Sequence, residues 1–103
     1  MKINRYITRG ISEQLSLDLQ ILLWNMVKER DYQGHTDYLH IFKIQEDDNM
    51  LSVIHEQEQP AYKLEYHYTN YVKNQNAVPK KVYVIREDNV DAFYYVMFLP
   101  EEY

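Results

Sequence analysis

The stretch DYLHIFKIQEDDNMLSVIHEQEQPAYKLEYHY, residues 37–68, contains three runs in which apolar and polar side chains alternate. Alternation with a period of two is typical of β-strands, because successive side chains point to opposite faces of a sheet. The charged segment EDDN, residues 46–49, predicts a hairpin turn, and Pro60 predicts a strand end because proline cannot donate to a ladder. The stretch therefore predicts three consecutive antiparallel strands over residues 37–44, 50–59 and 62–68.

The alternation also assigns faces to these strands. The third run places Tyr62, Leu64, Tyr66 and Tyr68 on one face, and Lys63, Glu65, His67 and Thr69 on the other. This pattern predicts that the tyrosine face packs and that the charged face lies in water. The first run is partly apolar on both faces, which is typical of a central strand.

Outward from this stretch, the chain predicts one long helix and further strands. The helix is expected over residues 17–30, where LDLQILLWNMVKER places apolar residues at spacings of three and four. A second apolar line of Leu17, Ile21 and Trp24 predicts further core packing, with a self-association surface as the alternative. Strands are expected at 4–9, ending at Gly10, at 81–88 and at 91–99, and the longest loop at 69–81.

These elements predict a single compact α+β domain over residues 1–103, in the order β-α-β-β-β-β-β. Its sheet should be a single, mainly antiparallel sheet of five to six strands, with the one long helix packed on one face. The other face has no predicted cover. Either its tyrosines face water or a second chain covers it, so a homodimer is one option.

Composition narrows the classes of function. Sixteen acidic and eleven basic residues give a net charge of −5, which disfavours nucleic-acid binding. The chain has no cysteine and no apolar run of about 20 residues, so we expect a cytoplasmic protein without a membrane span. With only two glycines, neither in a phosphate-binding motif, a nucleotide loop is not expected.

The segment HEQEQ, residues 55–59, invites comparison with a zinc-protease motif but has Gln59 where the second histidine would stand. Alternation also sends His55 and Glu56 to opposite faces. An acid/base or metal hydrolase built on His55, Glu56 and Glu58 remains an alternative. Four other residues could in principle supply a mixed set of metal ligands: His35, Asp37, His40 and His67. Their spacing does not require such a site, so no metal or cofactor is predicted.

The leading hypothesis is a non-catalytic protein-interaction or regulatory module, because nucleophile and phosphate motifs are missing and aromatic residues are abundant. The candidate contact residues, each with a competing role in the core, are Trp24, Tyr66, Tyr68, Tyr94 and Tyr95. The alternative is a single-stranded nucleic-acid-binding protein in which tyrosines stack on bases. Its phosphate contacts would be Lys73, Lys80 and Lys81.

Several short segments recur in a known order along the chain: RYITRG, LQILLW, DYLHIF, IHEQEQPAY, KVYVI and FLPEEY. Together they resemble the small Firmicute family of staphylococcal proteins of unknown function, domain of unknown function nine-sixty. The long aromatic segment DAFYYVMF, residues 91–98, departs from the family pattern. The resemblance implies cytosolic proteins without an assigned activity, some carried on mobile elements and inhibitor-like, and it supplies no catalytic residues.

Overall fold

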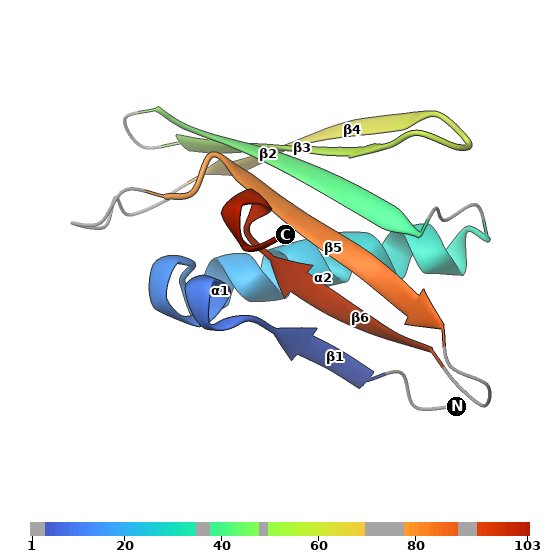
Figure 1. The fold of residues 1–103 in the computed structure, drawn as a ribbon. Coiled ribbons are helices and arrows are strands. Elements are labelled where there is room, and N and C mark those ends of the chain that lie inside the picture. Colours follow the sequence, from blue (N-terminus) through green and yellow to red (C-terminus); the bar gives the residue numbers. More distant parts are fainter. Residues whose placement is uncertain (1–3, 35–37, 48–49, 70–77, 89–92) are drawn as a thin grey trace.

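The computed structural model describes residues 4–34, 38–47, 50–69, 78–88 and 93–103, and it has an α+β fold as predicted (Figure 1). Its elements are β1 (Asn4–Ile7), α1 (Arg9–Gln14), α2 (Leu17–Tyr32), β2 (Leu39–Asp47), β3 (Met50–Gln57), β4 (Tyr62–Thr69), β5 (Lys81–Asp88), β6 (Phe93–Phe98) and the 3-10 helix η1 (Pro100–Glu102). The long helix and the three consecutive strands of the opening stretch are confirmed. The short helices α1 and η1 are additions to the predicted order.

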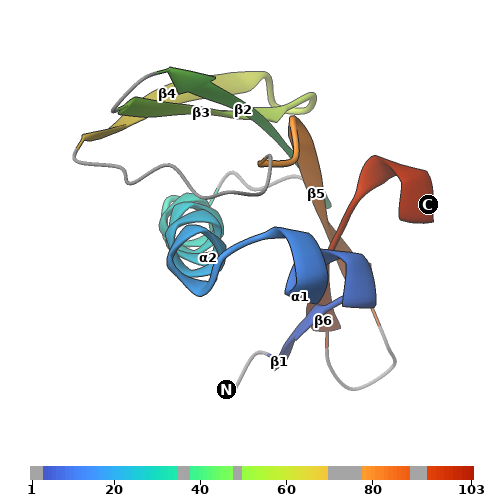
Figure 2. The same ribbon diagram turned by 90° about the vertical axis from the view of Figure 1, so that its left-hand side faces the viewer.

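The six strands form one sheet in the order β1-β6-β5-β2-β3-β4. All neighbours are antiparallel except β1 and β6, which are parallel, so the sheet is mixed. The sheet bends strongly: β2, β3 and β4 form one wing, and β5, β6 and β1 turn away from it (Figure 2). Helix α2 lies inside the bend, whereas η1 lies on the other side of β5 and β6 (Figure 2).

Local sequence explains where the helices begin and end. The hydroxyl of Ser16 accepts a hydrogen bond from the Leu19 amide at 3.4 Å and so caps α2. Gly34, with φ of 78°, follows the end of α2 in the left-handed conformation that favours glycine. Gly10 does not bound a strand and a helix; it lies inside α1, which Thr8 caps.

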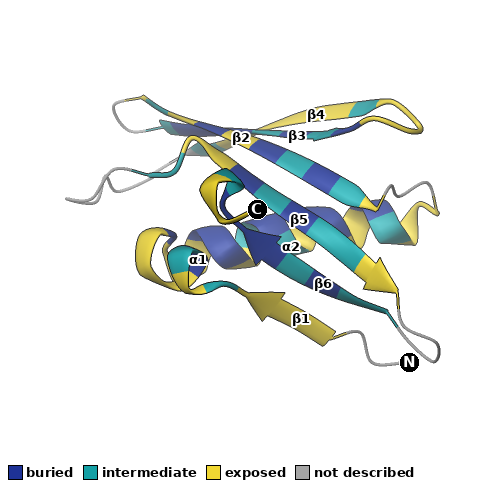
Figure 3. Cartoon of the chain, in the orientation of Figure 1, coloured by how far each residue is buried: buried dark blue, intermediate teal, exposed yellow. Residues whose placement is uncertain are grey.

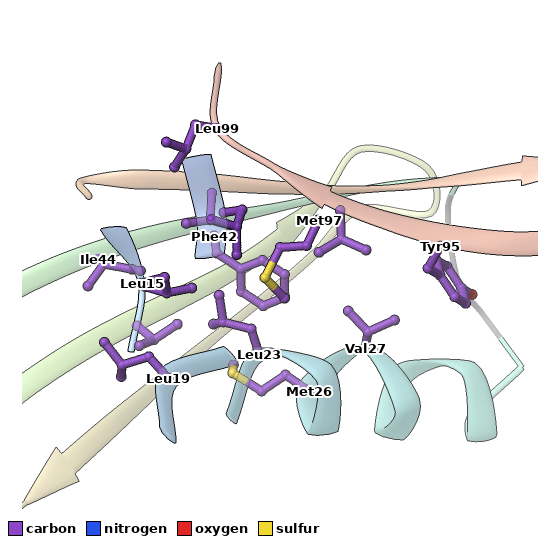
Figure 4. Packing of buried hydrophobic residues seen from close by; sticks show 14 of the residues in the cluster. Leu15, Leu19, Leu23, Met26, Val27, Phe42, Ile44, Tyr95, Met97 and Leu99 are labelled. Carbon is purple, nitrogen blue, oxygen red and sulfur yellow. The ribbon is translucent and has the colours of Figure 1, made fainter. Parts of the chain in front are cut away.

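The core lies between α2 and the inner face of the bent sheet. Leu19, Leu23 and Val27 are almost fully buried and face Phe42 and Met97 (Figure 4). With the buried Met26, this stripe repeats at three- and four-residue spacing, so its burial accounts for the helix. The second helical line is different, because Leu17 and Ile21 are 67% and 50% exposed while Trp24 packs partly against the core.

Burial declines toward the two edges of the sheet. All four residues of β1 are exposed, and most of β4 is exposed as well, whereas the inner strands alternate between buried and less buried residues (Figure 3). In β4 the predicted packing face is only partly covered, since Leu64 and Tyr66 are 45% and 42% exposed. Helix α2 thus packs on the central strands and leaves the outer ones open.

Candidate interaction surface

The histidine of the HEQEQ segment lies in the core. Strands β2 and β3 bring His40 Nδ1 and His55 Nε2 to 2.8 Å, and both side chains are fully buried. The His55 ring stacks on Phe42 with ring centroids 4.5 Å apart, and the Tyr62 ring meets it edge-on. His55 is therefore packed like an aromatic core residue and has no access to solvent.

The pKa of His55 is lowered to about 3, mainly by burial and in addition by the nearby His40 and Arg30. The imidazole is consequently neutral at pH 7. Its Nδ1 atom is buried and has no hydrogen-bond partner among the described residues. A neutral ring held between aromatic neighbours is well placed to pack, and poorly placed to exchange protons with a substrate.

Polar side chains around this histidine pair attach the C-terminal half of α2 to the sheet. Arg30 is buried; its Nε atom donates to Gln57 Oε1 at 3.2 Å, and its guanidinium lies 3.7 Å from the centre of the Tyr62 ring. The hydroxyl of Tyr95 donates to the carboxylate of Asp31 at 2.6 and 2.7 Å. These contacts fix the helix on the sheet, which is a structural role.

The residues of the hydrolase alternative do not converge. Glu56 lies on the opposite face from His55, where its carboxylate is 3.3 Å from Lys43 Nζ. Glu58 lies in the exposed turn after β3. The physical reason is strand alternation, which separates neighbouring residues however the sheet is packed.

The structure does not assemble the mixed ligand set considered for a metal. His40 and His67 point to opposite faces of the sheet, since His40 faces the helix side and His67 pairs across from Ser52 on the other side. His35 and Asp37 lie outside the described residues. Within the described part of the chain, no group of three or more potential ligands is close enough to hold a metal ion.

The five predicted contact residues are distributed unequally between core and surface. Tyr66 is exposed, and Trp24, Tyr68 and Tyr94 are half-buried. Tyr95 is 1% exposed, because it points toward α2 with its hydroxyl on Asp31, so it is a core residue and not a contact residue. Adjacent tyrosines of one strand face opposite sides, so Tyr94 and Tyr95 could not both serve one surface.

Large exposed apolar residues occur on α2 and on the inner face of β4, the outer strand that α2 leaves open. We call Leu17, Ile21, Leu64 and Tyr66 the apolar strip. A hollow of about 290 Å³ between α2 and β4 includes Ile21 of the strip and is lined by Asp18, Ile21, Leu22, Asn25 and Tyr68. The sequence identified all four positions as parts of apolar lines or faces, but it assigned Leu64 and Tyr66 to a packed face. Their exposure depends on where α2 lies, which no local pattern encodes.

Basic residues gather elsewhere, around a hollow of about 470 Å³ whose lining includes Lys43, Lys80 and Lys81. Lys43 and Lys81 face each other directly across the β2–β5 ladder. An adjoining hollow of about 640 Å³ shares Lys43 and Lys80. Lys80 and Lys81 are exposed, as the nucleic-acid alternative requires, and Lys73 lies outside the described residues.

Comparison with known proteins places this architecture in a family. A sequence model described as "Staphylococcal protein of unknown function (DUF960)" matches residues 4–102. The chain belongs to this family. The match confirms the resemblance carried by the short segments from RYITRG to FLPEEY, and it covers nearly the whole chain.

A solved structure has a fold similar to that of this chain. The crystal structure of a protein of unknown function from Enterococcus faecalis aligns with a TM-score of 0.77 and 17% identity, over 98% of this chain and 91% of that chain. At this identity the likeness shows the fold. No curated protein matches the sequence significantly. Among the described helices, none is long and apolar enough to span a membrane.

Proposed function

We propose that this protein is a non-catalytic protein-interaction or regulatory module that binds its partner through the apolar strip. The observation that carries the proposal is the exposure of four large apolar side chains on α2 and on the outer strand β4: Leu17, Ile21, Leu64 and Tyr66. Exposed apolar residues that gather on one surface mark interaction sites more often than isolated ones do. A more specific version of the proposal is that the protein is cytoplasmic, inhibitor-like and carried on a mobile element. That version rests on the sequence resemblance alone.

The composition of the strip suits a protein partner. It combines aliphatic residues with a tyrosine, and the polar Asp18 and Asn25 border the hollow beside Ile21. Protein interfaces typically have such an apolar centre with a polar rim, and tyrosine is enriched at their energetic centres. By contrast, the interior polar groups around His55 are occupied in holding α2 on the sheet.

A photo-crosslinking side chain at position 21, in the full chain inside its own cells, tests the proposal. Glu13 on α1 is exposed and is not part of the strip, so a crosslinker there is the matched control. We expect a discrete protein adduct from position 21 that is absent from position 13 and is lost when Leu17→Glu is added. The same adducts from both positions, or adducts that survive Leu17→Glu, would refute a partner on the strip.

The gathering of Lys43, Lys80 and Lys81 favours a second candidate function, the binding of a single-stranded nucleic acid. Two lysines that face each other across a ladder repel; Glu56 offsets part of the charge of Lys43, and phosphate groups would offset more of it. Three phosphate contacts predict that the logarithm of the binding constant falls with the logarithm of salt at a slope of about −2. Fluorescence anisotropy with a labelled oligonucleotide measures this slope, and absence of binding at low salt eliminates the candidate.

A further inference from the structure

Strand β4 is the outer strand of one wing of the sheet and spans eight residues, Tyr62–Thr69. Among the described elements, only β3 forms a ladder with it, so its other side is an open edge. The opposite edge of the sheet, β1, is only four residues long. A long open edge carries a row of backbone donors and acceptors that can pair with another strand.

We infer that two copies of this chain pair through β4, antiparallel, with Leu64 facing Leu64 of the second copy. The partner follows from the order of charges along the strand. An antiparallel pair of identical strands has its two-fold axis perpendicular to the sheet, so one residue must face its own copy. Residues at equal distances before and after that residue then face each other.

Symmetry leaves few choices for the residue on the axis. An axis at Lys63, Glu65 or His67 would place two identical charged or ionisable side chains directly opposite each other. Like charges in that position destabilise a strand pair. On the inner face, an axis at Tyr62 or Tyr68 would pair only the end of the strand, so Leu64 and Tyr66 remain as the choices for the axis.

Charge complementarity selects Leu64. With the axis there, Lys63 faces Glu65 of the second copy, and the symmetry produces this opposite-charge pair twice. On the inner face, Tyr62 then faces Tyr66 of the second copy, a cross-strand aromatic pair. An axis at Tyr66 would instead place Lys63 opposite Thr69 and would leave that charge without an opposite partner.

The side chains that this pairing uses are available in one copy. Lys63 is exposed and forms no ion pair among the described residues, and Glu65 makes only a long contact of 3.9 Å to His67 Nε2. Leu64 and Tyr66 are 45% and 42% exposed, so each has apolar surface to bury. Charges that guard an edge commonly repeat one sign, whereas Lys63 and Glu65 alternate in sign and are self-complementary.

The pairing would join two sheets edge to edge and place both copies of α2 on the same side. The strand parts of the two apolar strips, Leu64 and Tyr66 of each copy, would then meet at the axis. Because the second copy becomes one occupant of the strand part of the strip, the pairing rests on the proposed function. A different partner could still bind the helix part, at Leu17 and Ile21.

Charge exchange between the two copies tests the pairing directly. Lys63→Glu and Glu65→Lys are made separately in the full chain, and each should weaken dimerisation at least tenfold in analytical ultracentrifugation. An equimolar mixture of the two variants should dimerise as the unmodified chain does, because one carries two acidic and the other two basic residues at these positions. The combined variant Lys63→Glu/Glu65→Lys should dimerise as well.

Lys81→Glu is the matched control, since it reverses one exposed lysine on a different strand and should leave dimerisation unchanged. Recovery in the mixture also shows that the single variants fold. A chain that stays monomeric at all concentrations, or a mixture that stays monomeric, overturns the pairing. Either result leaves the crosslinking test at position 21 to decide the proposed function separately.

Discussion

The buried imidazole of His55 links solution pH to the stability of the core. Its pKa is lowered to about 3 in the folded chain, against an ordinary value of 6.5. Between these values the unfolded chain binds a proton that the folded chain does not, so stability falls as pH falls below 6.5. We expect this group to lower the free energy of unfolding by about 2 kcal/mol from pH 7.5 to pH 5.

Urea unfolding at the two pH values measures this effect. His55→Phe keeps a ring between Phe42 and Tyr62 but removes the titration, so its pH difference should be smaller than that of the unmodified chain by the same amount. His67→Gln removes an exposed histidine and serves as the control, which should keep the full difference. Equal pH differences in the unmodified chain and His55→Phe would contradict the role assigned to His55.

Tyr95 is a second residue whose role can be measured, through its hydroxyl group. Tyr95→Phe removes the donor that lies 2.6 and 2.7 Å from the two carboxylate oxygens of Asp31. Loss of a hydrogen bond to a charged group should lower the free energy of unfolding by about 2 kcal/mol. Tyr103→Phe, at an 89% exposed ring, should change it little, and urea unfolding compares the two variants. A Tyr95→Phe variant as stable as the unmodified chain would contradict this role.

At the level of elements, the carboxylate of Glu102 links η1 to the start of α1 by hydrogen bonds. It accepts hydrogen bonds from the Thr8 hydroxyl at 2.6 Å, the Leu99 amide at 2.8 Å and the Gly10 amide at 3.1 Å. A side chain at position 10 would collide with it, because an added Cβ would lie 2.7–2.9 Å from the carboxylate. This contact explains why glycine stands inside α1.

Gly10→Ala and Glu102→Gln should therefore each lower the Tm, since each removes the same contact. The combined variant should be little less stable than the worse single variant, because effects on one shared contact are not additive. Glu101→Gln is the control and should leave the Tm unchanged. Thermal unfolding followed by circular dichroism checks this, and fully additive losses would mean that the two residues act independently.

The elements that the sequence predicted are those whose own side chains carry a period. Helix α2 and strands β2, β3 and β5 each bury one regular face, β4 alternates in sequence although it is little buried, and β5 matches its predicted bounds of 81–88. Helix α1 and the parallel pairing of β1 were missed for a different reason. Both depend on residues more than 80 positions away, namely Glu102 for α1 and residues Tyr94 to Met97 for β1, which no local pattern reveals.

For the molecule as a whole, the size of one helix relative to the sheet determines which surfaces are exposed. Six strands at a spacing of about 4.8 Å are much wider than one helix of about 10 Å diameter. Helix α2 therefore covers the central strands, and Leu64 and Tyr66 on the outer strand remain open. The predicted excess of sheet surface over helix cover is correct, but the sequence alone did not show which tyrosines it exposes.

The shape of the whole assembly distinguishes edge pairing from other dimers. One copy has a radius of gyration of 13.7 Å, and pairing through β4 moves each centre of mass about half a sheet width from the axis. By the parallel-axis relation, the dimer should have a radius of gyration of about 19 Å. A compact globule of the same total length would have a radius of gyration of about 17 Å.

We expect small-angle X-ray scattering to give the larger radius of gyration for the unmodified chain and for the mixture of Lys63→Glu with Glu65→Lys. Each variant alone should give a value near that of one copy. A compact value for a stable dimer would place the contact on the faces of the sheet or on α2, and would rule out the β4 edge.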